Sequence, residues 1–469
     1  MKESKSKKCF SRFTHRFQKD DMVAYMNALR LRPVFIQQNL ATQVDNYINC
    51  MDGEKHSEGL QYVIEQLENS KIIVSSPAYD DLVLNRYQGV SKNTSIKIAY
   101  LILTDECNFN CSYCFMRREH QEGGTHFGAM SKETAIAAIN TFARLSSLDQ
   151  QDDERTIILY GGEPLLNFDV IKVVVQQVKQ LKKINRLAKQ TTINIVTNGS
   201  LLTDEVVQFL KASEIGIGIS IDGADIVTNA SRRYCDGSPT FPDIMRGIET
   251  CKRNGVTNYS LSVTITKASL ENFDSTISFL RQYAISKNIG FNILMSEEDE
   301  LKDEMEEYAH KASRFLLKAF NIFREDGIYE DRIMRKVNAF VDGKVHIFDC
   351  AATGANQIVV APDGTIGVCH GFLGTKTFFS DNVLNESFDP DTNPNFQEWR
   401  KRSPINMTEC LSCDAIGICG GGCPYNSFKT SSGNIWALDE RFCIHSKKTL
   451  YWLIWDLYEK TQKTNNESK

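Results

Sequence analysis

The sequence predicts an α/β fold, in which an open, partial (β/α)6 barrel stands between a small N-terminal module and a C-terminal cysteine-rich region. Three observations lead to this prediction. From residue 97 to about residue 300, short apolar strands alternate with amphipathic helices, which is the pattern of a parallel sheet. Residues 13–75 show a different order, with three strands, two helices and another strand. Seven of the 14 cysteines fall between Cys350 and Cys443.

The N-terminal module, residues 1–95, is expected to be winged-helix-like. Apolar residues recur at helical spacing in residues 37–49 and 57–69, so we predict a helix in each segment. A polar QKDD at residues 18–21 separates two strand-like segments and indicates a hairpin. A sheet of this kind can bind a peptide by strand addition, and a purely structural cap is an equal alternative. The strands are predicted at residues 13–17, 22–29, 33–36 and 71–75.

The barrel is expected to occupy residues 96–300 and to contain six βα units. Ser131 is placed to cap the helix that follows it, and Asp169 is placed to cap a helix with an apolar stripe. In such a sheet the catalytic groups lie at the carboxyl ends of the strands. The six strands are predicted at residues 96–103, 156–160, 193–197, 217–221, 260–265 and 290–294.

Composition limits the function further. The net charge is −5, and the only basic cluster, residues 2–8, is typical of a solvated terminus, so we expect no nucleic-acid partner. The sequence has no apolar segment of a signal peptide or a membrane span, which predicts a cytoplasmic protein without a membrane partner. In that reducing compartment, 14 cysteines indicate metal or redox chemistry more than disulfides.

The run CNFNCSYC places Cys107, Cys111 and Cys114 directly after the first barrel strand. Three thiolates can hold a four-iron cluster and leave one iron open to a reactant, although Cys-x2-Cys pairs also suit zinc. The run closely resembles the signature of the radical S-adenosylmethionine (radical SAM) superfamily. The resemblance implies a 4Fe-4S cluster that binds S-adenosylmethionine and releases a 5'-deoxyadenosyl radical. It also implies that Tyr113 packs near the adenine, where a core aromatic is the structural alternative.

Three further strand ends carry small or polar residues. The second strand ends in Gly161-Gly162-Glu163-Pro164, which resembles the GGEP motif of this superfamily and implies contact with the amino group of S-adenosylmethionine. The next two strands end in Asn-Gly and Asp-Gly dipeptides, which are common turns and also match the position of ribose or carboxylate ligands. The additional cofactor-binding candidates are Asn198, Ser220 and Asp222. Arg232 and Arg233 follow in a loop, where a surface role is equally expected.

The seven C-terminal cysteines resemble the SPASM domain, which extends many radical SAM enzymes that modify peptides and proteins. The resemblance implies two auxiliary 4Fe-4S clusters, and so three in all. It assigns Cys410, Cys413, Cys419 and Cys443 to the distal cluster, and Cys350, Cys369 and Cys423 to the nearer one. The nearer cluster then has only three cysteine ligands. Either another residue supplies the fourth ligand, or one iron is open to solvent or substrate. A zinc ribbon is the structural alternative.

The remaining segments are expected to be structural. Residues 301–348 are predicted to be a solvated helical connector, after an acidic run that begins at residue 296. The SPASM domain and a C-terminal tail are assigned to residues 349–469, with residues 464–469 disordered.

Together these features predict a radical SAM maturase that oxidatively modifies, and by preference crosslinks, a ribosomally made precursor peptide with a leader. The resemblance extends to maturases of the darobactin and cyclophane type. An electron donor such as flavodoxin or ferredoxin is the second expected partner. The alternatives are an anaerobic sulfatase-maturating enzyme and a non-catalytic Fe-S or zinc module. In the sulfatase group an aspartate follows the second cysteine of the SPASM domain, whereas here it is His370, a candidate base with an ordinary pKa of about 6.5.

Overall fold

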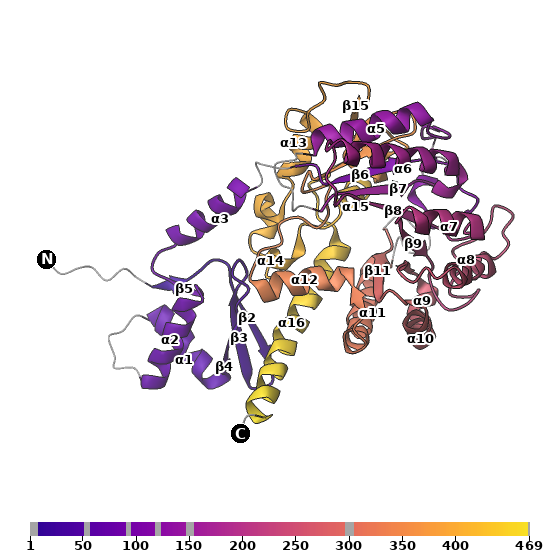
Figure 1. Cartoon of the computed structure of the whole chain (residues 1–469). Coiled ribbons are helices and arrows are strands. Elements are labelled where there is room, and N and C mark those ends of the chain that lie inside the picture. Colours follow the sequence, from indigo (N-terminus) through magenta and orange to yellow (C-terminus); the bar gives the residue numbers. More distant parts are fainter. Residues whose placement is uncertain are drawn as a thin grey trace.

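The computed structural model describes residues 8–50, 57–90, 95–117, 123–146, 154–295 and 304–467. Its centre is a ten-stranded sheet that curves into an open barrel (Figure 1). The six predicted barrel strands are confirmed, and they lie side by side in chain order, all parallel. They are β6 (Ile98–Ile102), β7 (Thr156–Tyr160), β8 (Thr192–Thr197), β9 (Gly216–Ser220), β10 (Ser260–Ile265) and β11 (Asn288–Ile293).

The sheet continues beyond the six predicted strands at both edges. At one edge β12 (Tyr329–Glu330) pairs with β11 in parallel. At the other, β13 (Gln357–Val360) pairs in parallel with β6, and β14 (Thr365–Gly367) and β15 (Phe379–Asn382) follow antiparallel. The cysteine-rich region therefore shares a sheet with the barrel, and this sheet crosses the boundary predicted at residue 349.

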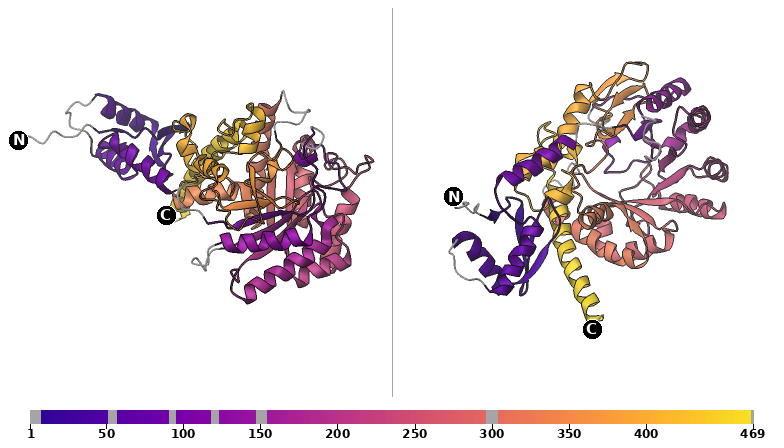
Figure 2. Two further views of the ribbon diagram at one scale, coloured as in Figure 1. Left: turned by 90° about the horizontal axis from the view of Figure 1, so that it is seen from above. Right: turned by 60° about the vertical axis from the view of Figure 1, so that its left-hand side comes forward.

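Helices form the outer layer of the barrel (Figure 2). Ser131 caps α5 as predicted, because its side chain accepts a hydrogen bond from the Thr134 backbone. The cap predicted at Asp169 is wrong: Asn167 occupies the N-cap position and Asp169 lies in the first turn, where a carboxylate suits the helix dipole. The helices of this layer are α5 (Lys132–Leu145), η1 (Pro164–Asn167), α6 (Phe168–Lys183), α7 (Asp204–Ala212), α8 (Phe241–Arg253), α9 (Lys267–Glu271) and α10 (Phe273–Tyr283).

The predicted solvated connector is instead part of the core. It forms α11 (Met305–Glu325) and α12 (Asp331–Asp342). The side chains of Phe315, Phe320 and Phe323 on α11 are at most 4% exposed and belong to the main hydrophobic core. The acidic start of this segment, residues 296–303, lies outside the described residues. The acidic charge of this start suggested a solvated helix. The apolar face of α11, which follows it, covers the end of the barrel instead.

The N-terminal module has the predicted order of strands and helices from residue 14 to residue 74, but one unpredicted strand precedes them. Its three-stranded antiparallel sheet has the order β2-β3-β4, and a short pair, β1 with β5, lies beside it. One helix, α3 (Ala78–Val90), was not predicted, because its apolar residues form no clear stripe. The elements are β1 (Cys9–Phe10), β2 (Thr14–Lys19), β3 (Met22–Asn27), β4 (Val34–Gln37), α1 (Gln38–Cys50), α2 (Glu58–Asn69) and β5 (Ile73–Val74).

The cysteine-rich region ends in a long helix, α16 (Glu440–Glu467), which runs between the barrel and the N-terminal module (Figure 1). The helix includes residues 464–467, so the tail predicted to be disordered is helical there. No helix in the described part of the chain is long and apolar enough to cross a membrane. The region's other helices are η2 (His370–Phe372), α13 (Pro394–Lys401), η3 (Pro404–Asn406), η4 (Thr408–Cys410), α14 (Ile416–Cys419) and α15 (Pro424–Thr430).

Candidate active site

The N-terminal triad, Cys107, Cys111 and Cys114, lies on the loop that follows β6. The segment after β9 holds this loop by backbone hydrogen bonds: the Asn110 N–H donates to the Arg233 carbonyl (2.6 Å), and Ser112 N–H donates to Ser231 (3.0 Å). All three cysteines are half-buried. The loop is thus fixed between two strand ends at the mouth of the barrel, where catalytic groups were expected.

The triad thiols are electrostatically coupled. Burial, and to a smaller extent the charges of Glu163, Cys111 and Cys114, raises the pKa of Cys107 to about 12. Burial also raises the pKa of Cys111 to about 12, although the nearby Arg232 guanidinium lowers it. As free thiols Cys107 and Cys111 stay protonated near neutral pH. They lose their protons when a metal binds, as thiolate ligation requires.

Tyr113 is held by a buried ionic network. Its hydroxyl donates to Asp222 Oδ2 (2.7 Å), and Asp222 Oδ1 forms an ion pair with Arg232 Nε (3.0 Å). The Arg232 guanidinium also lies over the Tyr113 ring, 5.5 Å from its centroid. Asp222 is fully buried and Arg232 is 7% exposed, so Arg232, which the sequence left undecided, is an interior residue. The network ties the cysteine loop to the end of β9.

The two glycines of GGEP are required by a close approach of two backbone segments. A Cβ added to Gly161, where φ is +143°, would lie 2.2 Å from the Thr104 carbonyl oxygen. At Gly162 it would lie 2.1 Å from the Glu106 carbonyl oxygen. The Gly162 N–H donates to the Thr104 carbonyl (2.8 Å). The two glycines thereby let the GGEP segment pack directly on the residues before Cys107.

Glu163 joins the ends of β7 and β8. One carboxylate oxygen accepts from the Leu165 N–H (3.0 Å) and the Thr197 hydroxyl (2.8 Å), and the other accepts from the Asn198 N–H (2.7 Å). The side chain is fully buried, and this burial raises its pKa to about 7 despite the three donors. Pro164 begins η1 directly after it. The Glu163 carboxylate is therefore an interior bridge between two strand ends.

Asn198 carries the contact from β8 to the cysteine loop. Its side-chain amide donates to Asn108 Oδ1 (2.8 Å) and lies 3.8 Å from Cys107 Sγ. Asn108 in turn donates to the Ser200 hydroxyl (2.9 Å). Ser220, the last residue of β9, lies at the same end of the sheet. The structure therefore brings the predicted residues of three strand ends to one side of the triad.

His370 lies against aromatic side chains from the barrel and the cysteine loop. Its ring centroid is 5.0 Å from those of Tyr100 on β6 and Tyr160 on β7, and 5.6 Å from that of Phe115, which follows Cys114. Burial lowers the pKa of His370 to about 4, so its imidazole is neutral. Its Nδ1 has no hydrogen-bond partner within the described residues. The cysteine-rich region thus places one unpartnered acceptor beside the N-terminal triad.

The C-terminal quartet comprises Cys410, Cys413, Cys419 and Cys443. Burial, and to a smaller extent the charges of Cys419 and Cys413, raises the pKa of Cys410 to about 12. The pKa of Cys443 is also raised to about 12, first by burial and then by the other three thiols. These four side chains, from η4, α14 and α16 and the turn between η4 and α14, therefore form one electrostatically coupled group.

The C-terminal trio comprises Cys350, Cys369 and Cys423. The Gly420 carbonyl accepts a hydrogen bond from the Asp349 N–H (2.9 Å), which brings Cys350 toward Cys423. Gly420 has a φ of +75°, and a Cβ at this position would clash with the backbone of Asp349. Burial is the main cause of the raised pKa of Cys423, and the charge of Cys350 adds to it. Burial also raises the pKa of Tyr100, and the charges of Cys350 and Cys369 add to that shift. Cys350 also lines an open hollow of about 460 Å³. The trio thus lies between the quartet and the barrel wall.

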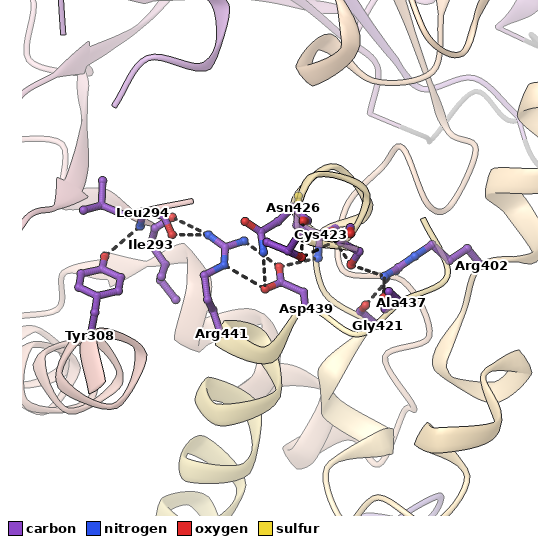
Figure 3. A network of polar contacts seen from close by, with 12 residues as sticks. Ile293, Leu294, Tyr308, Arg402, Gly421, Cys423, Asn426, Ala437, Asp439 and Arg441 are labelled. Atoms are coloured by element: carbon purple, nitrogen blue, oxygen red, sulfur yellow. Dashed lines mark hydrogen bonds and ion pairs between the residues drawn. The ribbon is translucent and has the colours of Figure 1, made fainter. Parts of the chain in front are cut away.

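Two buried arginines surround Cys423 (Figure 3). Arg402 is fully buried and donates to the carbonyls of Gly421 (2.8 Å), Ala437 (3.2 Å) and Ile435. The other arginine, Arg441, forms an ion pair with Asp439 at 2.7 Å. Within the described residues Arg402 has no ion-pair partner, and the charges that stabilise its cation belong to Cys423, Asp439, Cys350 and Cys410.

These surroundings fit anionic iron–sulfur clusters. A buried guanidinium without a direct ion pair needs nearby anions, and a cluster bound by thiolates supplies one. Among the described residues, which include all ten of these cysteines, no three His, Cys, Asp or Glu side chains are placed to hold a single metal ion. A four-iron cluster spreads its thiolates over several metal atoms.

The comparisons with known proteins agree with this geometry. The sequence profile of the Radical SAM superfamily matches residues 101–280, from β6 into α10. Residues 101–280 form a radical SAM domain. It is 25% identical over 430 residues to the radical SAM cyclopropyl synthase TigE of Paramaledivibacter caminithermalis, covering 87% of this chain and 84% of TigE. It is also 24% identical over 335 residues to a cysteine-type anaerobic sulfatase-maturating enzyme of Clostridium perfringens, covering 68% of this chain and 85% of that protein.

The fold of this radical SAM enzyme matches a solved structure over nearly its whole length. The structure of Streptococcus suis SuiB bound to precursor peptide SuiA aligns with a TM-score of 0.53, at 14% identity, over 93% of this chain and 99% of SuiB. At this identity the likeness shows the fold alone. The fold includes the N-terminal module as well as the radical SAM domain.

Several residues of the site were not predicted from the sequence. Asn108 and Ser200 lie inside or next to motifs that were recognised, so their polarity was a usable signal. Asp439 and Arg441 precede Cys443 by four and two residues, which is a weaker signal. Arg402 is far from any cysteine in the sequence, and only the fold reveals its place in this radical SAM enzyme.

Proposed function

We propose that this radical SAM enzyme oxidatively modifies, and by preference crosslinks, side chains of a ribosomally made precursor peptide. The observation that carries the proposal is the division of the seven C-terminal cysteines into a coupled quartet and a trio next to the barrel. We assign a 4Fe-4S cluster to the N-terminal triad and one auxiliary cluster each to the quartet and the trio, with residues 349–469 as a SPASM domain. A peptide substrate is supported by the fold shared with SuiB, whose structure holds a precursor peptide.

In this proposal the chain's own residues position and protect the chemistry. When bound at the triad, the cluster and S-adenosylmethionine supply a carbon radical that removes a hydrogen atom from the substrate. Asn198, Glu163 and Asp222 fix the triad loop to three strand ends, while Tyr113, Ser220 and the GGEP segment are proposed to bind S-adenosylmethionine. The His370 ring packs against Phe115, which follows the triad, and against Tyr160. Its Nδ1 has no hydrogen-bond partner among the described residues, and we propose that this atom contacts the substrate. The N-terminal module is proposed to bind the leader, and flavodoxin or ferredoxin to donate electrons.

Mass spectrometry of a precursor peptide coexpressed with the enzyme tests the function. A crosslink removes two hydrogen atoms, and the modified peptide should lose their mass. The triple variant Cys107→Ala, Cys111→Ala, Cys114→Ala should leave the peptide unmodified and release no 5'-deoxyadenosine, whereas Cys235→Ala, at an exposed thiol outside all three groups, should behave as wild type. Reconstituted protein should hold about twelve irons, four for each cluster, and about four irons would contradict the auxiliary assignments.

A sulfatase-maturating activity is the second candidate, favoured by the similarity to the Clostridium perfringens enzyme. It predicts that the enzyme oxidises a cysteine or serine of a sulfatase-derived peptide to formylglycine. In that group an aspartate follows the second cysteine of the SPASM domain. This chain has His370 at the corresponding position, which weighs against the sulfatase-maturating activity. Incubating the reconstituted enzyme with such a peptide and finding formylglycine would decide in its favour.

A further inference from the structure

A buried ion pair, Asp439 with Arg441, lies between the barrel and the trio cysteine Cys423 (Figure 3). The side chains are 0% and 2% exposed. The guanidinium binds the carboxylate with two hydrogen bonds, Nε to Oδ1 at 2.9 Å and Nη2 to Oδ2 at 2.7 Å. Such a two-point pair fixes both side chains in one orientation.

At one end the pair is anchored to the barrel. Arg441 Nη1 donates to the Leu294 and Ile293 carbonyls, at the point where β11 ends. Tyr308 of α11 holds the same segment, because its hydroxyl accepts from the Leu294 N–H (2.9 Å) and donates to the Ile265 carbonyl (2.6 Å). Arg441 is therefore attached to the last two long strands of the radical SAM domain.

At the other end the pair holds the loop of Cys423. Asp439 Oδ2 accepts the Cys423 N–H (3.2 Å), and Oδ1 accepts from the Asn426 side chain (3.1 Å). Each carboxylate oxygen already has two donors. This saturation argues against Asp439 as the missing fourth ligand of the trio.

The two charges act on Cys423 in opposite directions. The carboxylate is hydrogen-bonded to the backbone of Cys423, and the guanidinium lies directly behind that carboxylate. In a buried site the effect of such charges is weakly screened. The potential of an iron–sulfur cluster depends on nearby charge and on hydrogen bonds, and a cation stabilises the reduced, more negative state.

We propose that Asp439 and Arg441 are positioning residues that hold Cys423 against the end of β11 and set the reduction potential of the cluster that Cys423 helps to bind. This inference depends on the proposed assignment of the trio to an auxiliary cluster. The two residues oppose each other: Arg441 raises the potential and Asp439 lowers it. The pair thereby links the geometry of the barrel mouth to the redox state of the neighbouring cluster.

Redox titration of the fully reconstituted enzyme, followed by electron paramagnetic resonance, tests the proposal. The signal of the trio cluster is first identified as the one altered in Cys423→Ser. Arg441→Gln should then move its potential to more negative values, and Asp439→Asn should move it to more positive values. The double variant and Arg441→Lys should stay near wild type. Arg324→Gln is the matched control. It removes a half-buried ion pair with Asp456, which lies on α16 as Arg441 does, and it should change no potential.

Opposite shifts distinguish the proposal from a purely structural role. Shifts of the same sign in both single variants, or no shift in either, would overturn it. If the single variants lose iron, the double variant decides: recovered iron and a wild-type potential support the coupling, and equal depletion overturns it. If no wild-type signal responds to Cys423→Ser, the cluster assignment fails and this inference with it. Peptide modification, measured separately, shows whether the proposed function stands.

Discussion

At the scale of single residues, the network of Asp222, Arg232 and Tyr113 gives the clearest stability prediction. Asp222→Asn leaves the Arg232 guanidinium buried without an anion, so it should destabilise the protein by about 3–5 kcal/mol. Tyr113→Phe removes one hydrogen bond and should cost about 1 kcal/mol. Chemical denaturation measures both. The control Asp204→Asn, in an exposed pair with Arg253, should have no measurable effect, and an equal loss in all three variants would contradict the prediction.

Glu163 predicts a pH dependence of stability. Its pKa rises from the ordinary 4.5 to about 7 because burial disfavours the carboxylate. The folded state therefore binds a proton that the unfolded chain releases, and this contribution is complete below pH 4.5 and is lost as the pH rises through 7. The loss should amount to roughly 3 kcal/mol. Between pH 5 and 8 the thermal midpoint of the wild type should fall relative to that of Glu163→Gln; a constant difference would contradict the prediction.

At the scale of elements, the contact between the ends of β6 and β7 predicts a strong effect from one methyl group. In Gly162→Ala the new Cβ would lie 2.1 Å from the Glu106 carbonyl oxygen, and backbone cannot move aside as a side chain can. We expect the triad loop to be displaced and about four irons to be lost per chain. Gly290→Ala in β11, where nothing lies within 4 Å, should keep its iron and thermal midpoint. Iron analysis and thermal unfolding compare the two.

Some elements were predictable because their signals are local. The six strands and the Ser131 cap follow from short patterns, and all six strands lie in the predicted order. The pairing of β13 with β6 was not predictable, because it joins residues 98 and 357 and depends on which sheet edge the barrel leaves open. The connector was misread for a related reason. Its acidic start is visible in the sequence, whereas the surface that its apolar face covers exists only in the fold.

At the scale of the whole molecule, the sequence predicted which residues form the candidate site and much less of what they contact. Cysteine spacing marked the triad, and the resemblance to the SPASM domain implied the division of the other seven cysteines into quartet and trio. Neither showed that GGEP packs on the cysteine loop, that Arg232 is interior, or that Arg402 lies among three cysteines of two groups. Candidate cysteine ligands can be recognised from short sequence spacings. The arginine charges beside them come from distant segments, so their positions are known only from the fold.

The largest unpredicted feature at this scale is the docking of the N-terminal module on α16. One face of its sheet packs on α1 and α2, and the other shares a core with Trp455 and with α14, which carries Cys419. Trp455 is 3% exposed and its ring lies 6.0 Å from that of Phe35 on β4. Lys19 on β2 adds an ion pair with Glu459 at 2.7 Å. The module is thereby held next to α14, which carries the quartet residue Cys419.

This docking predicts that Trp455→Ala loosens the module while the barrel stays folded. The cavity left by the indole should cost about 3–5 kcal/mol. Because this cost falls on one interface, limited proteolysis should release an N-terminal fragment ending near residue 90, while the iron content of the triad persists. Leu457→Ala, a 36% exposed residue of the same helix, should be cleaved no faster than wild type. If Trp455→Ala resists cleavage as wild type does, the α3 and β2 contacts suffice to hold the module, and its coupling to the quartet through α16 is not required.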